Sequence, residues 1–373
     1  MEYSQERVTT LHQLGEGPPP IPADALADTA VVVPLTERDC ETETATRVFS
    51  ELSVLDPGLV VVPIRASAGQ IDAICAWLTG FDVEIDPLWC CAPGLNRTLA
   101  AAGLPTASGK GRDVWLALGV AAEHGRYVVV HDADARKYAA TQVRRLLTPV
   151  TMGYAFAKGY YARVEDGQLY GRLCRLFYEP LLDALATCHD DPIVSYLGAF
   201  RYALAGECAM TADLARLLSP PPSWGLEVAT LGDAFAHAGF TGTAQVDLGR
   251  HVHDHRPVRG ESGLEGMSHE VSDALFRVLT SHGVTPEYDT ITAHYRSAGE
   301  RLIAQYQADA TFNGLEYDRV AEKTQLDRYA EAIGPPGPDR RLPPWTDVSI
   351  DPMDVRTGAQ PRRESDPVTR MAE

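Results

Sequence analysis

Lysine and long apolar runs are both scarce in this chain of 373 residues. Only four of its 33 basic residues are lysines, and its 51 acidic residues give a formal net charge of −18. Such an acidic surface repels phosphate backbones, which argues against binding to nucleic acid. No apolar run approaches the roughly 20 residues that span a bilayer, so we expect no stable insertion into a membrane.

The chain also lacks paired cysteines and an amino-terminal export signal. Its seven cysteines are odd in number and form no C-x-x-C pair, which favours reduced, mostly buried thiols over disulfides or a structural zinc site. Residues 1–17 are polar and acidic, unlike a signal peptide, and we expect a cytoplasmic protein. The acid-rich, lysine-poor surface resembles that of halophilic proteins and predicts that low salt destabilises the fold.

Strand-like and helix-like segments alternate through the first part of the chain. After an irregular lead-in expected over residues 1–28, β-branched runs at residues 30–34 and 59–64 predict strands. Helical spacing at residues 113–124 leads into another buried run at residues 127–131. This alternation predicts right-handed crossovers and an α/β fold with a mainly parallel, Rossmann-like sheet and flanking helices.

The other segments give less regular patterns. Residues 83–85 and 154–163 are candidate strands, and residues 171–186 have helical spacing. Residues 286–333 are amphipathic and predict a C-terminal helical extension. Residues 334–373 begin with a Pro- and Gly-rich run and then turn polar, which predicts a poorly ordered tail.

The apolar run at residues 127–131 leads into the sequence Asp132-Ala133-Asp134. In an α/β sheet this places two carboxylates at the carboxyl end of a buried strand, where ligands bind. Carboxylate oxygens suit Mg²⁺ or Mn²⁺, which complete their coordination with water and substrate phosphate. An isolated Asp-x-Asp is more often only a turn, so the interpretation depends on its neighbours.

Two further motifs accompany this pair. Lys110 stands between two glycines just before the helical segment, where an ammonium can reach a phosphate. His251, His253 and His255 occupy alternate positions, which share one face of an extended segment. These imidazoles could form a zinc site, could lend one ligand to a mixed Asp/His ion site, or could be solvated in a surface loop.

Together these pieces resemble the retaining glucosyl-3-phosphoglycerate and mannosyl-3-phosphoglycerate synthases, glycosyltransferases of the A-type fold that are similar to family 2. The resemblance runs from about residue 31 to residue 283. The matching segments are residues 31–34, 109–111, 132–134, 158–161, 171–172, 204–207, 225–227 and 245–249, followed by His253.

The resemblance implies a nucleotide-sugar-binding half over residues 29–150. Asp134 and His253 would ligate Mg²⁺ or Mn²⁺ on the donor diphosphate, with Asp132 near the ribose and Lys110 in contact with the donor. The other implied donor-binding residues are Pro34, Leu35, Glu37, Ala133, Leu204, Gly206 and Glu207.

The resemblance implies an acceptor-binding half over residues 151–285. Arg172 would hold the acceptor's phosphate or carboxylate, for which a guanidinium fork is suited. Cys174 stands where the family has a hydroxyl residue and His255 where it has an amide. The implied acceptor-binding residues are Gly171, Arg172, Cys174 and His255, and the implied catalytic residues are Asp134, Glu227 and Arg172.

The implied activity is metal-dependent transfer of a hexose, with retention of configuration, from an NDP-sugar to a small anionic acceptor. UDP-glucose, GDP-glucose and GDP-mannose remain open as donors, and 3-phosphoglycerate is the expected acceptor, as in compatible-solute synthesis. A homodimer is also open. The alternatives are a glycosyltransferase acting on a lipid carrier or surface glycan, a nucleotidyltransferase, a non-catalytic sugar-nucleotide-binding protein, and a zinc protein built on the histidines.

Overall fold

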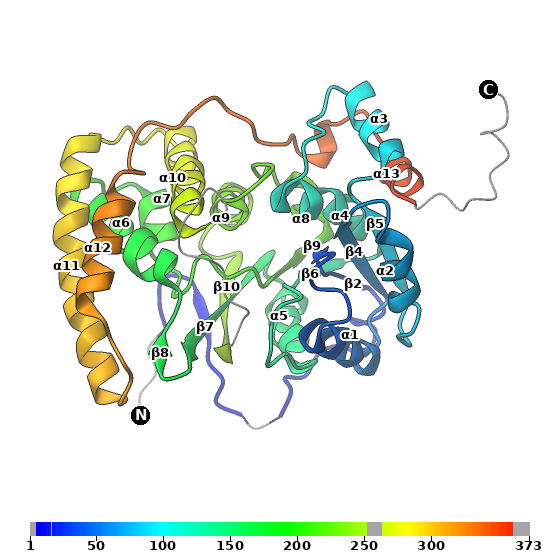
Figure 1. Cartoon of the computed structure of the whole chain (residues 1–373), viewed down its shortest axis with the longest axis horizontal. Coiled ribbons are helices and arrows are strands. Elements are labelled where there is room, and N and C mark those ends of the chain that lie inside the picture. Colours follow the sequence, from blue (N-terminus) through cyan, green and yellow to red (C-terminus); the bar gives the residue numbers. More distant parts are fainter. Residues whose placement is uncertain (1–4, 16, 252–262, 361–373) are drawn as a thin grey trace, which may run out of the picture.

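The computed structural model describes residues 5–15, 17–251 and 263–360 (Figure 1). Within them a sheet of ten strands has the order β1-β10-β7-β9-β6-β2-β4-β3, with β5 beside β4 and β8 beside β7. Only β8 and β9 run antiparallel to their neighbours in this part of the chain, so the expected α/β fold with a mainly parallel sheet is confirmed. The strands are β1 (Thr9–Leu11), β2 (Thr29–Val32), β3 (Leu35–Thr36), β4 (Leu59–Arg65), β5 (Ile85–Trp89), β6 (Tyr127–Val130), β7 (Phe156–Glu165), β8 (Gln168–Leu169), β9 (Cys208–Thr211) and β10 (Thr243–His251).

Helices flank this sheet. Figure 1 shows α4 above the strands and α5 below them, with α11 and α12 at the end of the molecule remote from α1, α2 and α3. The helices are α1 (Glu43–Leu55), α2 (Ile71–Leu78), α3 (Pro93–Ala101), α4 (Lys110–His124), α5 (Thr141–Thr151), the π-helix η1 (Cys174–Tyr178), α6 (Glu179–Cys188), α7 (Pro192–Leu197), α8 (Ala212–Leu217), α9 (Leu226–His237), α10 (Leu264–Ser281), α11 (Tyr288–Phe312), α12 (Arg319–Ala330), the 3₁₀ helix η2 (Trp345–Asp347) and α13 (Pro352–Gly358).

The strands in the middle of the sheet position the site. β2, β4 and most of β6 are buried because their β-branched residues face helices on both sides. β2 pairs in parallel with both neighbours, so that Val32 lies opposite Val61 and Val130. The residues that follow these strands, among them Pro34 and Asp132, therefore reach the same edge of the sheet, where α/β proteins bind ligands.

The amino-terminal lead-in contains a strand that the sequence interpretation did not predict. β1 pairs in parallel with β10, and the Gln245 Nε2 group donates a hydrogen bond to Thr10 Oγ1 at 2.9 Å. The rest of the described lead-in has no other strand or helix. Three residues give too short a pattern to recognise locally, because the partner strand lies far along the chain.

The prediction of a poorly ordered tail is wrong for residues 334–360. In Figure 1 this segment crosses from α12 to the opposite end of the molecule, where α13 lies beside α3. Trp345 stacks on Trp115 with ring centroids 4.5 Å apart, and Leu342 is completely buried. A Pro-rich composition lowers the number of apolar residues available for burial. A few buried side chains, here Leu342 and Trp345, are nevertheless enough to order such a segment.

The remaining expectations differ mainly in their boundaries. The helix expected at residues 171–186 begins as the π-helix η1 and continues as α6, and α11 and α12 occupy the expected helical extension. The candidate strand at residues 83–85 starts at Ile85 and extends to Trp89. No helix in the described part of the chain is long and apolar enough to cross a membrane.

Candidate active site

Lys110 and Asp132 form an ion pair at the carboxyl end of β6. The Lys110 Nζ atom lies 2.9 Å from Asp132 Oδ1 and 3.1 Å from Oδ2. Lys110 is the first residue of α4, whose start is close to the strand edge. The fold therefore brings together two motifs that stand apart in the sequence.

The glycines beside Lys110 make room for protein backbone. A Cβ atom on Gly109 would lie 2.2 Å from the carbonyl oxygen of Pro222, and one on Gly111 would lie 1.9 Å from that of Pro221. The Gly111 N–H donates to the Ser223 carbonyl at 3.1 Å. The residue 221–223 segment therefore occupies the space next to both glycines.

Glu227 completes this cluster from a third part of the chain. It lies in the first turn of α9, and its Oε1 atom is 3.3 Å from Lys110 Nζ. Burial lowers the pKa of Lys110, but the carboxylates of Asp132, Glu227 and Asp134 outweigh that effect and raise it overall. Lys110 therefore stays protonated in the folded protein, partly shielded from water.

The turn at residues 204–207 lies directly against the aspartate. A Cβ atom on Gly206 would meet Asp132 Oδ2 at 2.5 Å, so only glycine permits this close approach. The Lys158 ammonium donates a short hydrogen bond to the carbonyl oxygen of Ala205, in the same turn. Lys158 is fully buried, and burial lowers its pKa. Sequence reasoning included Lys158 in a matching segment but gave it no role.

The expected nucleobase side is built by the ends of β2 and β4. Leu35 is buried and Pro34 half-buried. Glu37 is exposed and accepts hydrogen bonds from the Ser67 N–H at 3.0 Å and the Ser67 hydroxyl at 3.1 Å, which lower the pKa of its carboxyl group. These contacts hold the two loops together at the strand edge.

A half-buried ion pair behind this edge was missed from the sequence. The Arg65 guanidinium donates to Asp113 Oδ2 through Nε at 2.9 Å and Nη2 at 2.6 Å. Because Asp113 lies in the first turn of α4, this pair ties the end of β4 to the helix that carries Lys110. An acidic residue three positions after Lys110 was the available signal.

His131 and Tyr138 were also missed as supports of the carboxylate loop. The His131 ring packs edge-on against Tyr138 at a centroid distance of 5.2 Å, and both residues are buried. Burial lowers the pKa of His131 to about 4, so this imidazole is neutral at pH 7. Ala133, between the two aspartates, is buried as well.

Asp134, the other carboxylate expected to hold a metal ion, lies in the same loop after β6. Asp134 lies close enough to Lys110 to raise its pKa, and carboxylate oxygens fit a hard divalent cation. Among the described residues, no group of three or more Asp, Glu, His or Cys side chains converges on one point. The expected metal ligand His253 and the expected acceptor residue His255 lie outside the described residues. The three-histidine zinc site therefore stays a prediction.

The expected acceptor side lies between β8 and η1. Gly171 has φ +78°, and a Cβ atom there would lie 2.7 Å from the Tyr202 hydroxyl. The half-buried Arg172 guanidinium makes no hydrogen bond or ion pair with any residue that the structure describes. Cys174 is buried with its thiol 3.9 Å from Glu179 Oε1, and burial raises the pKa of that thiol.

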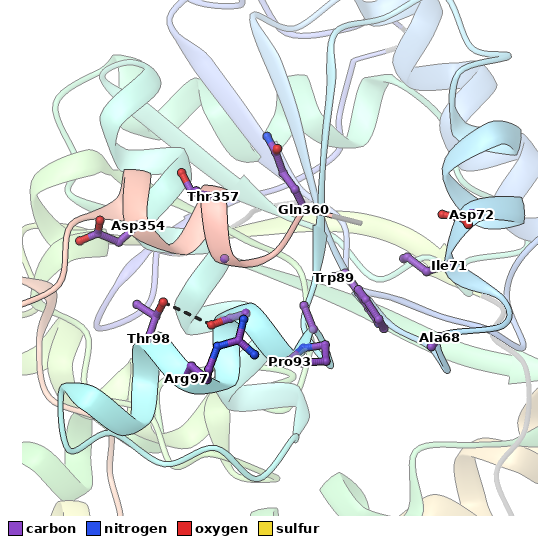
Figure 2. A pocket seen from close by; sticks show the side chains of 13 residues that line it. Ala68, Ile71, Asp72, Trp89, Pro93, Arg97, Thr98, Asp354, Thr357 and Gln360 are labelled. Carbon is purple, nitrogen blue, oxygen red and sulfur yellow. Dashed lines mark hydrogen bonds between the residues drawn. The ribbon is translucent and has the colours of Figure 1, made fainter. Parts of the chain in front are cut away.

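A separate cavity of about 660 Å³ lies between α3, α13 and the loop after β4. Figure 2 shows Trp89, Arg97 and Gln360 among the side chains that line it. None of the residues expected in the donor or acceptor site contributes to this wall. This cavity is therefore distinct from the candidate active site.

Comparison with known proteins gives relatives of one kind, although no family model matches the chain. A glucosyl-3-phosphoglycerate synthase of Methanococcoides burtonii is 31% identical over 379 residues, covering 93% of each chain. One of Persephonella marina is 34% identical over 285 residues, covering 72% of this chain and 70% of the relative.

A solved structure also shares the fold. The crystal structure of glucosyl-3-phosphoglycerate synthase from Mycobacterium tuberculosis with Mn²⁺, UDP and phosphoglyceric acid superposes with a TM-score of 0.54. It is 24% identical, and the match covers 75% of this chain and 88% of that one. The expected A-type glycosyltransferase fold is thus confirmed. By its sequence relatives and its fold, the chain belongs to the glucosyl-3-phosphoglycerate synthases, which are glycosyltransferases.

Proposed function

We propose that this chain transfers a glucosyl group from a nucleoside-diphosphate sugar to 3-phosphoglycerate with retention of configuration. Family membership supports the reaction class, and one observation carries the site. Asp132, Lys110 and Glu227 come from three distant segments and meet beside Gly206 at the carboxyl end of β6. UDP-glucose is the first donor to test, because one solved relative was crystallised with Mn²⁺, UDP-glucose and glycerol 3-phosphate.

We place the donor diphosphate beside Lys110 and Asp134. Asp134 and His253 would hold Mg²⁺ or Mn²⁺, which when bound neutralises the charge that develops on the departing diphosphate. The permanently charged Lys110 ammonium would contact the same phosphates, with Asp132 near the ribose. Pro34, Leu35 and Glu37 would border the base.

We assign the sugar and the acceptor to the opposite side of this cluster. Glu227 and the turn formed by Leu204, Gly206 and Glu207 would line the hexose. Arg172 would bind the anionic acceptor and orient its hydroxyl toward the anomeric carbon, an entropic contribution to rate. We propose front-face attack in which a phosphate oxygen of the leaving group accepts the acceptor's proton. The residues beside Arg172 in this site would be Gly171, Cys174 and His255.

The experiment that tests the function is a panel of donors and acceptors. UDP-glucose, GDP-glucose and GDP-mannose are each paired with 3-phosphoglycerate, glycerate or no acceptor, in the presence of Mg²⁺ or Mn²⁺ and 1 M KCl. We expect release of nucleoside diphosphate only with 3-phosphoglycerate, fastest with a glucose donor. Release without acceptor, or none in any pair, contradicts the proposal and redirects the search to other acceptors or to a binding function.

The role of Asp134 is tested by substitution. We expect Asp134→Ala to lower kcat by at least about a thousandfold, because the departing diphosphate loses a bound countercharge worth several kcal/mol. Its melting temperature should stay near that of the parent protein. Asp82→Ala, which removes an exposed aspartate, is the matched control and should keep full activity. Activity of Asp134→Ala near the parent value would remove Asp134 from the metal site.

Four finer expectations stay part of this proposal. We infer a cytoplasmic, salt-adapted enzyme of compatible-solute synthesis that forms a homodimer. Its acidic charge supports salt adaptation. Light scattering at low and high KCl gives the oligomeric state, and a monomer under both conditions would contradict the dimer.

A further inference from the structure

The C-terminal helical extension covers the hairpin that carries Arg172. This hairpin, residues 165–172, is called the acceptor hairpin below. Glu316, in the connection between α11 and α12, donates its N–H to the Gly167 carbonyl at 2.7 Å. The Gln168 Nε2 group donates to Glu316 Oε2 at 3.2 Å. The connection therefore runs beside β8 like an additional strand residue.

Arg175 provides a second tie, from the acceptor hairpin to α12. Its Nε donates to the Tyr170 carbonyl at 3.0 Å and its Nη2 to the Leu169 carbonyl at 3.3 Å. The same guanidinium donates to both carboxylate oxygens of Glu322, at 3.0 Å from Nη1 and 2.7 Å from Nη2. One side chain thus joins α12 to the two residues that precede the turn at Gly171.

This ion pair is buried. The side chains of Arg175 and Glu322 are 7% and 6% exposed, and the Tyr306 ring lies 4.7 Å from the guanidinium carbon. Burial lowers the pKa of Arg175, but the hydrogen bonds and charge of Glu322 raise it overall. Removing one partner of such a pair leaves the other charge buried without compensation, so the local geometry depends on both.

The turn itself leaves Arg172 little freedom. Gly171 adopts a left-handed φ against the Tyr202 hydroxyl, and its carbonyl accepts the Arg175 N–H at 3.0 Å. The π-helix η1, a rare distortion that is often found at functional sites, begins three residues later, at Cys174. The backbone of Gly171, which directly precedes Arg172, is thus held between Tyr202 on one side and Arg175 on the other.

We propose that Glu322 is a positioning residue for acceptor binding. Through Arg175 it fixes the turn that aims Arg172 at the anionic group of the acceptor, so the helical extension is part of the acceptor site. This inference rests on the proposed function. The donor cluster of Lys110, Asp132 and Glu227 is held by its own contacts, and loss of Glu322 therefore acts on the acceptor and spares the donor.

The test is a comparison of Michaelis constants. Glu322→Gln keeps the shape of the side chain and removes its charge. We expect KM for 3-phosphoglycerate to rise about tenfold, with KM for UDP-glucose within twofold of the parent value, and Arg172→Lys should give the same pattern. Glu322→Asp, which keeps the charge, should recover part of the loss.

Glu300→Gln is the matched control on the same pair of helices. Glu300 pairs with Lys323 at 2.7 Å, but both side chains are more than half exposed. Its substitution should change neither Michaelis constant. If Glu322→Gln fails to fold, Tyr306→Leu removes the ring over Arg175 and keeps the Arg175–Glu322 ion pair, although it also removes the hydrogen bond that the Tyr306 hydroxyl donates to Glu179 Oε2. The same acceptor-selective increase is expected.

The possible failures are distinguishable. A parent enzyme without 3-phosphoglycerate-dependent release of nucleoside diphosphate overturns the proposed function, and this inference with it. The inference alone is overturned if the parent enzyme is active and Glu322→Gln leaves the KM for 3-phosphoglycerate unchanged, while calorimetry shows that this variant binds UDP with Mn²⁺ normally. A change in kcat with both Michaelis constants unchanged also overturns it.

Discussion

The Lys110 ammonium is held by carboxylates from two distant parts of the chain. Its contacts to Asp132 and Glu227 are 2.9 and 3.3 Å long, and the group is largely withdrawn from water. Charges in such surroundings interact more strongly than they do in bulk solvent. A cation fixed in this way is suited to a diphosphate, since it needs no reorganisation when the ligand arrives.

Removal of this cation is the first prediction at the residue scale. Lys110→Met leaves two neighbouring carboxylates without a countercharge and, in the proposed donor site, removes a charged contact worth about 2 kcal/mol. We expect kcat/KM for the donor to fall roughly 30-fold or more in steady-state assays. Lys323→Met, the same change at an exposed lysine, should have no effect. Equal activity of the two variants would contradict the assignment of Lys110.

Asp233 gives a prediction for the pH dependence of stability. Burial raises the pKa of Asp233 to about 6, although the hydrogen bond that its Oδ2 accepts from the Ser219 N–H at 2.7 Å lowers the pKa in part. The folded state therefore binds more protons than the unfolded state between about pH 4 and pH 6, and stability falls as pH rises through this window.

Asp233→Asn removes that dependence and keeps a hydrogen-bond acceptor for Ser219. The variant and the parent protein should have similar free energies of unfolding near pH 4. At pH 7.5 the variant should be the more stable by at most about 3 kcal/mol, the equivalent of two pKa units. Urea denaturation at both pH values measures this, and a difference that does not change with pH would exclude Asp233 as the cause.

At the scale of elements, α4 is buried on nearly every side. A surface helix normally leaves one face in water, but residues 111–122 of α4 are all buried. The segment after α12 covers the outer face, where Trp345 stacks on Trp115 and its Nε1 donates to the Trp115 carbonyl at 2.8 Å. Gly119 allows this, because a Cβ there would lie 2.1 Å from the Trp345 ring.

This contact predicts that Trp345 stabilises the whole domain. Trp345→Ala should lower the free energy of unfolding by about 3–5 kcal/mol, the usual cost of removing a buried aromatic side chain. Phe312→Ala is the control, since Phe312 is 89% exposed and its loss should cost no more than about 0.5 kcal/mol. Urea denaturation of both variants gives the comparison, and equal effects would show that the segment does not support α4.

At the scale of the whole molecule, negative charge dominates. The net charge is −18, and most of the ion pairs on the described surface are exposed, where each contributes little. Repulsion between unpaired carboxylates therefore opposes folding at low ionic strength. Salt shortens the range of that repulsion to about 3 Å at 1 M.

We accordingly expect stability to increase with salt. Raising KCl from 0.05 to 1 M should raise the melting temperature by about 4 °C or more, which corresponds to roughly 1–2 kcal/mol in a domain of this size. Differential scanning calorimetry measures the change, with sucrose at matched osmolality to separate screening from solute exclusion. A flat or falling melting temperature would contradict salt adaptation.

The sequence predicted the features whose signals are local. The β-branched runs of β2, β4 and β6 predict buried parallel strands. The order and spacing of eight short segments, among them those of Lys110, Asp132 and Glu227, carry the family resemblance. Boundaries were less accurate where the pattern is short, as at β5 and η1. The disorder expected over residues 334–360 was wrong because composition does not reveal where a single tryptophan packs.

By itself, the sequence determined the fold class, the acidic surface and the carboxylate pair that ends a buried strand, because each depends on residue type and spacing within one segment. Tertiary structure decided which distant groups meet: Glu227 at Lys110, Gly206 against Asp132, Trp345 on Trp115 and Glu322 on Arg175. The physical reason is that these pairings depend on how packed elements place side chains from separate segments, and one sequence carries no local record of that placement.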